Sequence, residues 1–369
     1  MTPNLFSPIR LGHLELANRL VVAPMCQYSA DDGSATPWHM MHLGMLANSG
    51  AGLLILEATA VQREGRITHG CLGLYSDANE AALRPVLDAC RTYGSAKLGI
   101  QLGHAGRKAS SKRPWEGKTM QDPCDPVDAW PTHAPSALAM SGHAIPRAMT
   151  VDDLSATRQA FVDAVARCER LGIELIELHA AHGYLLHEFL SPISNQRTDN
   201  YGGSLSNRMR FPLEVFADCR ASWAAHKPLG IRVSATDWMD GGLTVDEVVI
   251  FAQELKKLGC DFIDVSSGGI DPSARMTIAP NYQVPFAERI KHESKLPTMA
   301  VGLITDAHQA EAILVEDKAD MVAAARQFLD DPHWGWHAAY TLGAELTLPP
   351  QYRRAGLKTW TPAARHAKR

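Results

Sequence analysis

Residues 151–184 read VDDLSATRQAFVDAVARCERLGIELIELHAAHGY, an amphipathic stretch followed by a short apolar run and then by polar residues. The first part predicts a helix over Val151–Leu171 with Thr150 as its N-cap, because the two aspartates that follow suit the positive end of the helix dipole. The run Glu174–His179 predicts a buried strand. A helix followed closely by such a strand is one step of a repeating β/α chain.

The same alternation of apolar runs and amphipathic stretches continues along the chain. A second helix is expected over Thr244–Leu258, where Gly259 occupies the usual position just after a helix end. Eight runs are rich enough in apolar and β-branched residues to form strands. They are Arg19–Ala23, Gly52–Ala58, Lys97–Leu102, Glu174–His179, Leu229–Ser234, Phe262–Ser266, Thr298–Val301 and Met321–Ala325.

Eight β/α units predict the α/β class and a single (β/α)8 TIM barrel that spans residues 1–369. The segment of about 107–150 is rich in Pro, Ser and Trp, and we expect it to be a long insertion after the third strand. A doubly wound open sheet has the same alternation of elements, so the positions of the polar residues must separate the two folds.

Polar or otherwise special residues lie near the end of nearly every predicted strand. A closed barrel would gather them at one mouth, whereas an open sheet would spread them along an edge of roughly 30 Å. No GxGxxG motif follows an early strand, so a Rossmann fold lacks its usual mark. The residues in question are Cys26, Thr59, Gln101, His104, His179, His182, Arg232, Gly268, Gly269, Gly302 and Arg326.

Composition excludes several classes of function. The chain is 46% hydrophobic and 21% charged, which is ordinary for a folded enzyme, and its net charge of −4 argues against nucleic acid or an anionic membrane as a partner. No apolar run reaches the roughly 18 residues of a membrane span, and the start lacks a signal-peptide pattern, so we expect a cytoplasmic location. The seven cysteines never occur in CxxC spacing, which argues against disulfide, zinc and iron–sulfur frameworks.

Four motifs, each at the end of a predicted strand or in the loop after it, carry a specific signal because they occur together and in order along nearly the whole chain. The set resembles the Old Yellow Enzyme family, and the cysteine in its first motif resembles the thermophilic-like, xenobiotic-reductase branch. The motifs are Ala23-Pro24-Met25-Cys26-Gln27-Tyr28-Ser29, Gln101-Leu102-Gly103-His104-Ala105-Gly106-Arg107, His179-Ala180-Ala181-His182-Gly183-Tyr184, and Asn195-Gln196-Arg197-Thr198-Asp199-Asn200-Tyr201-Gly202-Gly203-Ser204.

The resemblance implies a catalytic set. His179 and His182 would donate hydrogen bonds to a carbonyl or nitro oxygen of the substrate, and Tyr184 would protonate the α-carbon. Cys26 would contact the N5/O4 edge of the flavin and tune its reduction potential. Tyr28 would present a second hydroxyl to the substrate. These assignments apply only where the motif residues match.

The resemblance also implies a non-covalent FMN site with no metal. Gln101 would pair with the amide edge of the ring, Arg232 would place a positive charge beside it, and Gly302 with Arg326 would hold the phosphate. The family usually has glycine where this chain has Ala325, and alanine resists positive φ, which puts the geometry of the phosphate loop in question. The implied cofactor-binding set is Ala23, Pro24, Met25, Cys26, Ala60, Gln101, Arg232, Gly302, Ala325 and Arg326.

Each of these residue types also has a structural interpretation. An isolated cysteine is usually an inert buried thiol, and a His-x-x-His pair at His179 and His182 could bind a metal if the fold supplied a third ligand. Tyrosines commonly pack at the rim of a core, and Arg232 could form a salt bridge inside the barrel.

The C-terminal tail, about 345–369, contains Gln351-Tyr352-Arg353-Arg354. This run resembles the segment by which the branch inserts an arginine into a neighbouring active site, so Arg354 is expected to contact substrate there and the chain to form a homo-oligomer, either a dimer or a tetramer. A solvated tail is the alternative.

The predicted function is therefore that of an FMN-dependent NAD(P)H:activated-alkene oxidoreductase that acts by a ping-pong mechanism at one site. Hydride would pass from NADPH or NADH to FMN, and then to the β-carbon of an α,β-unsaturated carbonyl or nitro compound. One alternative is a 2,4-dienoyl-CoA reductase-like flavoenzyme, which would carry extra domains and an iron–sulfur cysteine cluster. Another is a flavin-binding barrel without turnover, suggested only by Ala325.

Overall fold

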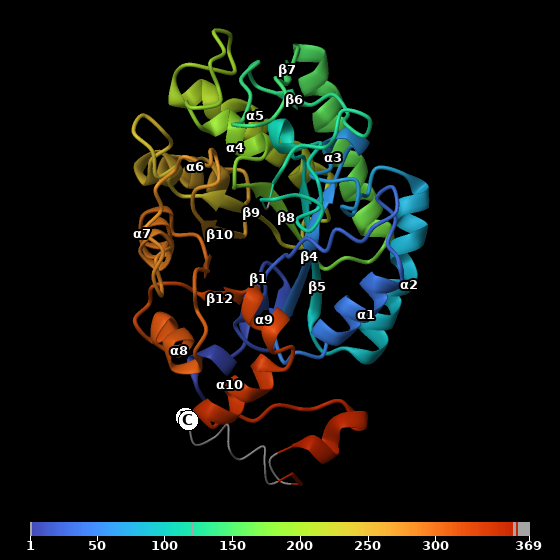
Figure 1. The fold of residues 1–369 in the computed structure, drawn as a ribbon. Coiled ribbons are helices and arrows are strands. Elements are labelled where there is room, and N and C mark those ends of the chain that lie inside the picture. The colour runs from blue at the N-terminus through green and yellow to red at the C-terminus, as the bar shows by residue number, and fades with distance from the viewer. Residues whose placement is uncertain (1, 120, 357–358, 361–369) are drawn as a thin grey trace.

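Eight parallel strands close into a barrel in a computed structural model that describes residues 2–119, 121–356 and 359–360 (Figure 1). The eight predicted strands are all confirmed, with ends that differ by at most two residues. Around the barrel they are β3 (Leu20–Val22), β4 (Leu53–Ala60), β5 (Lys97–Gly103), β8 (Leu175–Ala180), β9 (Leu229–Ser234), β10 (Phe262–Ser266), β11 (Thr298–Ala300) and β12 (Met321–Ala324).

Closure of the sheet excludes the doubly wound alternative. The last strand pairs in parallel with the first, with Val322 opposite Leu20 and Ala324 opposite Val22. Because every strand of the barrel runs in the same direction, all the carboxyl ends meet at one face. The TIM barrel predicted from the sequence is therefore the observed fold.

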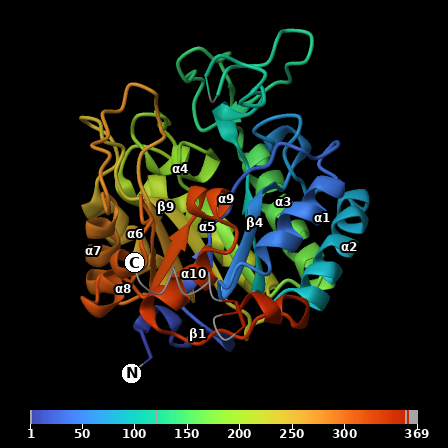
Figure 2. The ribbon, with the colours of Figure 1, turned by 60° about the horizontal axis from the view of Figure 1, so that its bottom comes forward.

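Helices cover the outside of the barrel (Figure 2). The predicted helix that begins at Val151 is found as α3, and Thr150 caps it by accepting a hydrogen bond from the Asp153 N–H. The α-helices are α1 (Pro37–Leu46), α2 (Asp77–Tyr93), α3 (Val151–Arg170), α4 (Leu185–Leu190), α5 (Leu205–Ser222), α6 (Val245–Lys257), α7 (Val284–Ser294), α8 (Ala307–Val315), α9 (Arg326–Asp330) and α10 (Trp334–Leu342). None of the described helices is long and apolar enough to cross a membrane.

One end of the barrel is closed by an N-terminal hairpin. Strands β1 (Ile9–Leu11) and β2 (Leu14–Leu16) pair antiparallel, and Leu11 and Leu16 are buried in one apolar cluster with barrel residues such as Leu53. In Figure 2 this hairpin lies below the barrel. A polar site can therefore form only at the opposite end, where the strands finish.

The connection from β5 to α3 rises above that opposite end (teal to green in Figure 2). It contains a 3-10 helix, η3 (Gly106–Lys108), and two short strands, β6 (His133–Ala134) and β7 (Arg147–Ala148), which pair with each other. The remaining 3-10 helices are η1 (Asn4–Phe6), η2 (Arg63–Gly65) and η4 (Pro350–Ala355).

Candidate active site

The two histidines at the end of β8 face each other at the carboxyl end of the barrel. The rings of His179 and His182 are edge to face with centroids 5.2 Å apart, and the ring of Tyr184 is 4.9 Å from that of His179. Burial, and next the positive charge of Arg232, lower the pKa of both histidines well below the ordinary value. Both imidazoles are therefore neutral near pH 7, and each carries one N–H.

Hydrogen bonds settle which nitrogen carries that proton. The backbone N–H of Ala181 donates to His179 Nδ1 at 3.3 Å, so the proton of this imidazole is on Nε2. His182 Nε2 lies 2.7 Å from Ser266 Oγ, and the Ser266 hydroxyl donates to Gln283 Oε1 at 3.2 Å. Ser266 must therefore accept from His182 Nε2–H. Both histidines present Nε2–H, but that of His182 already has an acceptor.

The turn that follows β8 requires an unusual backbone. His182 has φ 60° and Gly183 has φ 73°, and a Cβ on Gly183 would collide with the backbone of Gly269. Only glycine permits this close approach between the loops after β8 and β10. The loop after β8 thereby places His182 and Tyr184 on the same side of the mouth.

Lys108 holds the same turn from the neighbouring connection, and the sequence motifs did not single it out. Its Nζ donates to the backbone oxygen of His182 at 2.7 Å and to that of Gly269 at 2.9 Å, and lies 5.1 Å from the centre of the Tyr184 ring. Burial lowers the pKa of Lys108 to about 8. The signal available in the sequence was its place directly after the Gly106-Arg107 pair.

The phenol of Tyr184 is a very weak acid in this site. Burial, and next the proximity of Cys26, raise the pKa of its phenol well above the ordinary value. Gln121 Nε2 donates to the Tyr184 hydroxyl at 3.5 Å, from the connection above the barrel. The phenol therefore keeps its proton throughout the neutral range.

The first motif brings Cys26 and Tyr28 to the same place. Both pack, together with Tyr184 and Trp130, on a small apolar cluster that contains Ile67, Cys71, Ala105 and Ala109. Burial raises the pKa of Tyr28, whose ring meets that of Trp115 edge to face at 5.9 Å. Ala60 lines a cavity with His179, Tyr184 and Cys71, whereas Met25 lines a separate cavity with Glu57. Pro24, the motif residue directly before Met25, is partly buried.

Inside the barrel, four polar side chains form a layer beneath the mouth. Gln101 Nε2 donates to Glu177 Oε1 at 2.7 Å, so the amide of Gln101 is oriented before any ligand binds. Arg232 Nε lies 3.0 Å from Asp264 Oδ2. Burial, and next the charge of Asp264, raise the pKa of Glu177 to about 8, while burial raises that of Asp264. Arg232 therefore forms a salt bridge inside the barrel, which was the structural alternative to a flavin-binding role. It also lines a cavity.

That cavity, of about 190 Å³, lies between the ends of β11 and β12. Gly302 has φ 116°, and a Cβ there would come within 3.0 Å of Gln283 Nε2. Ala325 has φ −111°, outside the left-handed region, so alanine meets no positive-φ penalty here. The geometric concern raised by alanine in place of glycine is therefore wrong for this position. The remaining lining includes Ala23, Ser266, Tyr282, Thr305, Ala324, Arg326 and Gln327.

The residues of this region fit FMN. Two guanidinium groups, Arg232 and Arg326, line one cavity and supply the positive charge that a phosphate and an anionic reduced ring require. The glycine backbone at Gly302 gives room for close approach by the phosphate. Gln101 offers an amide that is already oriented.

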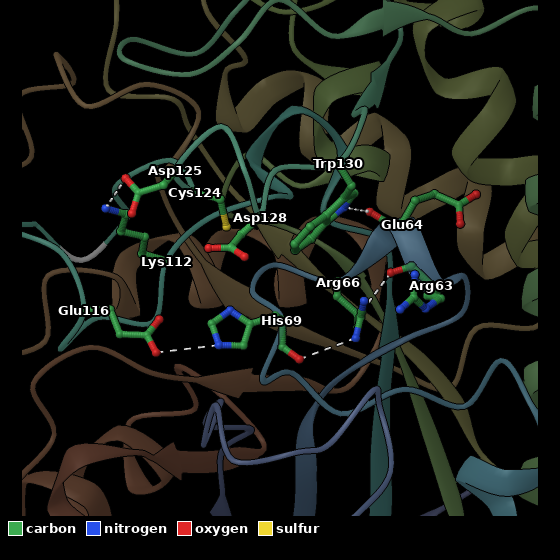
Figure 3. A pocket seen from close by; sticks show the side chains of 10 residues that line it. All are labelled: Arg63, Glu64, Arg66, His69, Lys112, Glu116, Cys124, Asp125, Asp128 and Trp130. Atoms are coloured by element: carbon green, nitrogen blue, oxygen red, sulfur yellow. Dashed lines mark hydrogen bonds and ion pairs between the residues drawn. The ribbon is translucent and has the colours of Figure 1, made fainter.

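A second, larger cavity of about 740 Å³ opens outside the mouth (Figure 3). Trp130 separates it from the apolar cluster of Tyr28 and Tyr184, and the Trp130 indole donates to the backbone oxygen of Glu64 at 2.9 Å. Charges of both signs line this cavity. Lys112 pairs with Asp125 and His69 lies near Glu116, whereas the two arginines pair with Asp32, outside the lining. The lining residues are Arg63, Glu64, Arg66, His69, Lys112, Glu116, Cys124, Asp125, Asp128 and Trp130.

Arg354 is not part of this constellation within one chain. It is exposed on η4, and the red segment that contains η4 lies toward the lower end of the barrel in Figure 2, away from the connection above the mouth. The last residues of the predicted tail, 361–369, lie outside the described part of the chain. No group of three or more His, Cys, Asp or Glu side chains that could hold a metal occurs among the residues that the structure describes.

The chain is similar to known proteins along nearly its whole length. A model described as the NADH:flavin oxidoreductase / NADH oxidase family covers residues 4–345. The chain is 43% identical over 357 residues to an NADPH dehydrogenase of Geobacillus sp. (strain WCH70), covering 96% of this chain and 99% of that relative. It is 42% identical over 357 residues to the NADPH dehydrogenase of Bacillus subtilis (strain 168), with the same coverage.

The chain belongs to this family of flavin oxidoreductases. Among solved structures, morphinone reductase has a TM-score of 0.77 at 28% identity, covering 95% of this chain and 93% of its own. The Old Yellow Enzyme homologue from Zymomonas mobilis also has a TM-score of 0.77, at 25% identity, covering 97% and 96%.

Family membership confirms the resemblance to Old Yellow Enzyme that the four motifs carried. The chain is an oxidoreductase that uses FMN as its cofactor and a nicotinamide dinucleotide as its reductant.

Proposed function

We propose that this flavin oxidoreductase reduces activated alkenes, namely α,β-unsaturated carbonyl compounds, maleimides and nitro compounds. The observation that carries the proposal is the meeting of two neutral imidazoles and a protonated phenol at the mouth of the barrel. Donors of this kind stabilise negative charge that develops on a carbonyl or nitro oxygen. Tight binding of such an oxygen activates the double bond conjugated to it.

FMN, when bound, supplies the hydride chemistry, by taking a hydride from NAD(P)H and passing it to the β-carbon of the alkene. Gly302 and Arg326 would hold its phosphate, Arg232 would favour the anionic reduced ring, and Gln101 would pair with the amide edge of the ring. Ala23, Pro24, Met25, Ala60 and Ala325 complete the proposed cofactor-binding set.

His179 and His182 bind the substrate oxygen through Nε2–H. Hydrogen-bond donors aimed at a developing oxyanion contribute roughly 3–4 kcal/mol each in other enzymes. His179 is ready for this role as it stands, because its Nδ1 already accepts from the backbone and its proton is on Nε2. His182 exchanges its contact with Ser266 for the substrate oxygen.

Tyr184 donates the proton to the α-carbon. A phenol with a raised pKa is protonated throughout the working range, and a strong base at carbon can still take its proton. Lys108, 5.1 Å from the ring centre, stabilises the phenolate that remains. Tyr28 places a second hydroxyl on the substrate side of the site.

Cys26 acts on the cofactor and not as a nucleophile. The hydrogen bond to Cys71, and next burial, raise the pKa of Cys26 well above its ordinary value, so it stays a thiol. An S–H donor beside the flavin edge favours the electron-rich reduced ring. Cys26→Ala is expected to shift the flavin potential and alter both half-reactions without ending turnover.

One site serves both substrates, so the mechanism is ping-pong and the reductant leaves before the alkene enters. The test is anaerobic reduction of the purified protein. NADPH should bleach the flavin band near about 450 nm, a general property of oxidised flavins, and cyclohexenone should restore it. Failure of every activated alkene to restore the band would favour the alternative of a flavin-binding barrel without turnover. Comparison of NADPH with NADH in the same assay assigns the preferred reductant.

We also propose that the chain forms a homo-oligomer. Trp38, Met41 and Met45 are exposed at 45%, 56% and 40% on one face of α1, an apolar surface of the kind found in subunit interfaces. Arg354 would then reach the active site of a neighbouring subunit. Sedimentation with and without Met41→Glu tests the contact, because a charge at the centre of this face should dissociate the assembly.

A further inference from the structure

Two cysteines distant in the sequence meet beside the active site. Cys26 follows β3, and Cys71 lies in the loop after β4. The two loops are joined by their backbones, since the Ala30 N–H donates to the Gly70 oxygen at 2.8 Å. Both residues belong to the same small apolar cluster, where each thiol shifts the pKa of the other.

The hydrogen bonds around this pair distinguish the two sulfur atoms. The Thr68 backbone N–H donates to Cys71 Sγ at 3.3 Å. The Thr68 hydroxyl accepts from the Gly70 N–H at 3.1 Å and lies 3.4 Å from Cys71 Sγ, so its proton is directed to the sulfur. Two groups of Thr68, its N–H and its O–H, therefore converge on Cys71 Sγ.

This arrangement makes Cys71 the more acidic thiol of the pair. Burial alone would raise the pKa of Cys71, but the hydrogen bonds from Cys26 and Thr68 outweigh burial and lower it. The pKa of Cys26 is raised by the same contact, and next by burial. In a pair of unequal thiols, the more acidic one is oxidised first, because it is the more readily deprotonated, and the other then resolves it.

The pair borders the active site, and Cys71 itself is buried. Cys26 is partly exposed, and Cys71 lines the cavity that also contains Ala60, His179 and Tyr184. The remaining cysteines are different. Burial raises the pKa of Cys90, Cys168, Cys219 and Cys260, which are all buried, and Cys124 lies apart, in the outer cavity.

We propose that Cys26 and Cys71 form a redox-sensitive pair that hydroperoxides convert into a disulfide. The Cys71 thiolate attacks the O–O bond of ROOH and takes one oxygen to become a sulfenic acid, and the departing RO⁻ is protonated to ROH. Cys26 sulfur then attacks the sulfenic sulfur, so the S–S bond forms as the S–O bond breaks. The hydroxyl leaves with the Cys26 proton as water. Two thiols are oxidised and one hydroperoxide is reduced to ROH and H₂O.

The disulfide would act directly on the cofactor site, since it removes the S–H group of Cys26. This consequence rests on the proposed contact of Cys26 with FMN, whereas formation of the disulfide does not. Because seven cysteines are present and all are free in the structure, a change in thiol count is easily read. A dithiol reductant reverses the reaction by thiol–disulfide exchange.

The experiment treats the FMN-loaded protein with hydrogen peroxide, unfolds it, counts free thiols and maps the peptides. We expect the count to fall from seven to five, with Cys26 and Cys71 in one cross-linked peptide pair that has lost two hydrogen atoms. Dithiothreitol should restore all the thiols. Seven remaining thiols, a cross-link that uses any other cysteine, or oxidation of Cys71 only to sulfinic acid would each overturn the proposal.

Three variants complete the test. Cys26→Ser and Cys71→Ser should each abolish the cross-link, while Cys124→Ser, a change at another accessible thiol, should still lose two thiols. A cross-link that persists in Cys71→Ser would overturn the assignment. Bleaching of the flavin by NADPH, measured on the same untreated samples, reports on the proposed function separately, since the thiol count requires no turnover.

Discussion

His179 and His182 stand at the same strand end, but their ring protons have different partners. Among the described residues, His182 Nε2–H is bonded to Ser266, whereas no hydrogen-bond partner is found for His179 Nε2. A ligand oxygen gains a new hydrogen bond from His179, but with His182 it must replace an existing one. The two histidines should therefore contribute unequally to binding.

We predict that His179→Ala weakens binding of a phenol ligand more than His182→Ala does, by on the order of tenfold, and that the double variant abolishes it. The measurement is titration of the long-wavelength charge-transfer band of the flavin–phenol complex. The absorbance of bound FMN is the control, and it should be unchanged in all three variants. Equal losses, or a larger loss in His182→Ala, would contradict the inferred proton positions, and loss of FMN would show that the histidines are misassigned.

Protonation of the Glu188 carboxyl makes the free energy of unfolding depend on pH. Its carboxyl is fully buried on α4, accepts from the Arg107 N–H at 2.8 Å, and has its pKa raised to about 8 by burial. The native state therefore retains a proton that the unfolded chain releases above roughly pH 4.5. Stability contributed by this proton is complete below that pH and is lost as the pH rises to about 8.

We therefore predict that the stability advantage of the native chain over Glu188→Gln shrinks as the pH is raised from 5 to 8. Urea denaturation at a series of pH values measures the two free energies of unfolding. Glu345→Gln, at an exposed position, is the matched control. An advantage that grows with pH would show that Glu188 is ionised in the folded protein, paired with Lys108.

The loops after β11 and β12 differ in how strictly the backbone requires glycine. Gly302 at φ 116° occupies a conformation that alanine resists, and an added Cβ would crowd Gln283 and Tyr282. Ala325 at φ −111° has no such constraint. Both residues line the cavity assigned to the FMN phosphate, so they form a natural comparison.

Gly302→Ala is expected to weaken FMN binding by at least about tenfold, since strain at a positive φ costs on the order of 1–2 kcal/mol and the cavity also narrows. Ala325→Gly should change affinity by less than about threefold, a difference below 1 kcal/mol. Fluorescence titration of apoprotein with FMN measures both. A large gain in affinity on Ala325→Gly would mean that the loop changes its backbone when the phosphate binds.

At the scale of the whole molecule, the cofactor should stabilise the fold, because its site is built from strand ends that only the closed barrel brings together. A ligand at 100 times its dissociation constant adds about 2.7 kcal/mol to the free energy of unfolding. We predict an increase of this size on addition of FMN, measured by urea denaturation. Riboflavin, which lacks the phosphate, should add less at the same concentration. An equal effect would remove the phosphate role of Gly302 and Arg326.

Local sequence determined the elements of this protein. Strand and helix boundaries follow from apolar period, caps and breakers, as at Thr150 and Gly259, and these are short-range properties of the chain. The motifs likewise placed Cys26, His179, His182 and Tyr184 at one mouth, because parallel strands in a closed barrel end on the same face.

Only the tertiary structure decided how those residues are supported. Lys108 beneath the Tyr184 turn, Ser266 against His182, and Cys71 beside Cys26 all come from other strands or the loops after them, and no period or spacing in the chain relates them. The tolerance of alanine at position 325 was likewise set by a backbone angle. The physical reason is that burial, proton position and φ depend on contacts between segments far apart in sequence, and these contacts exist only once the barrel has closed.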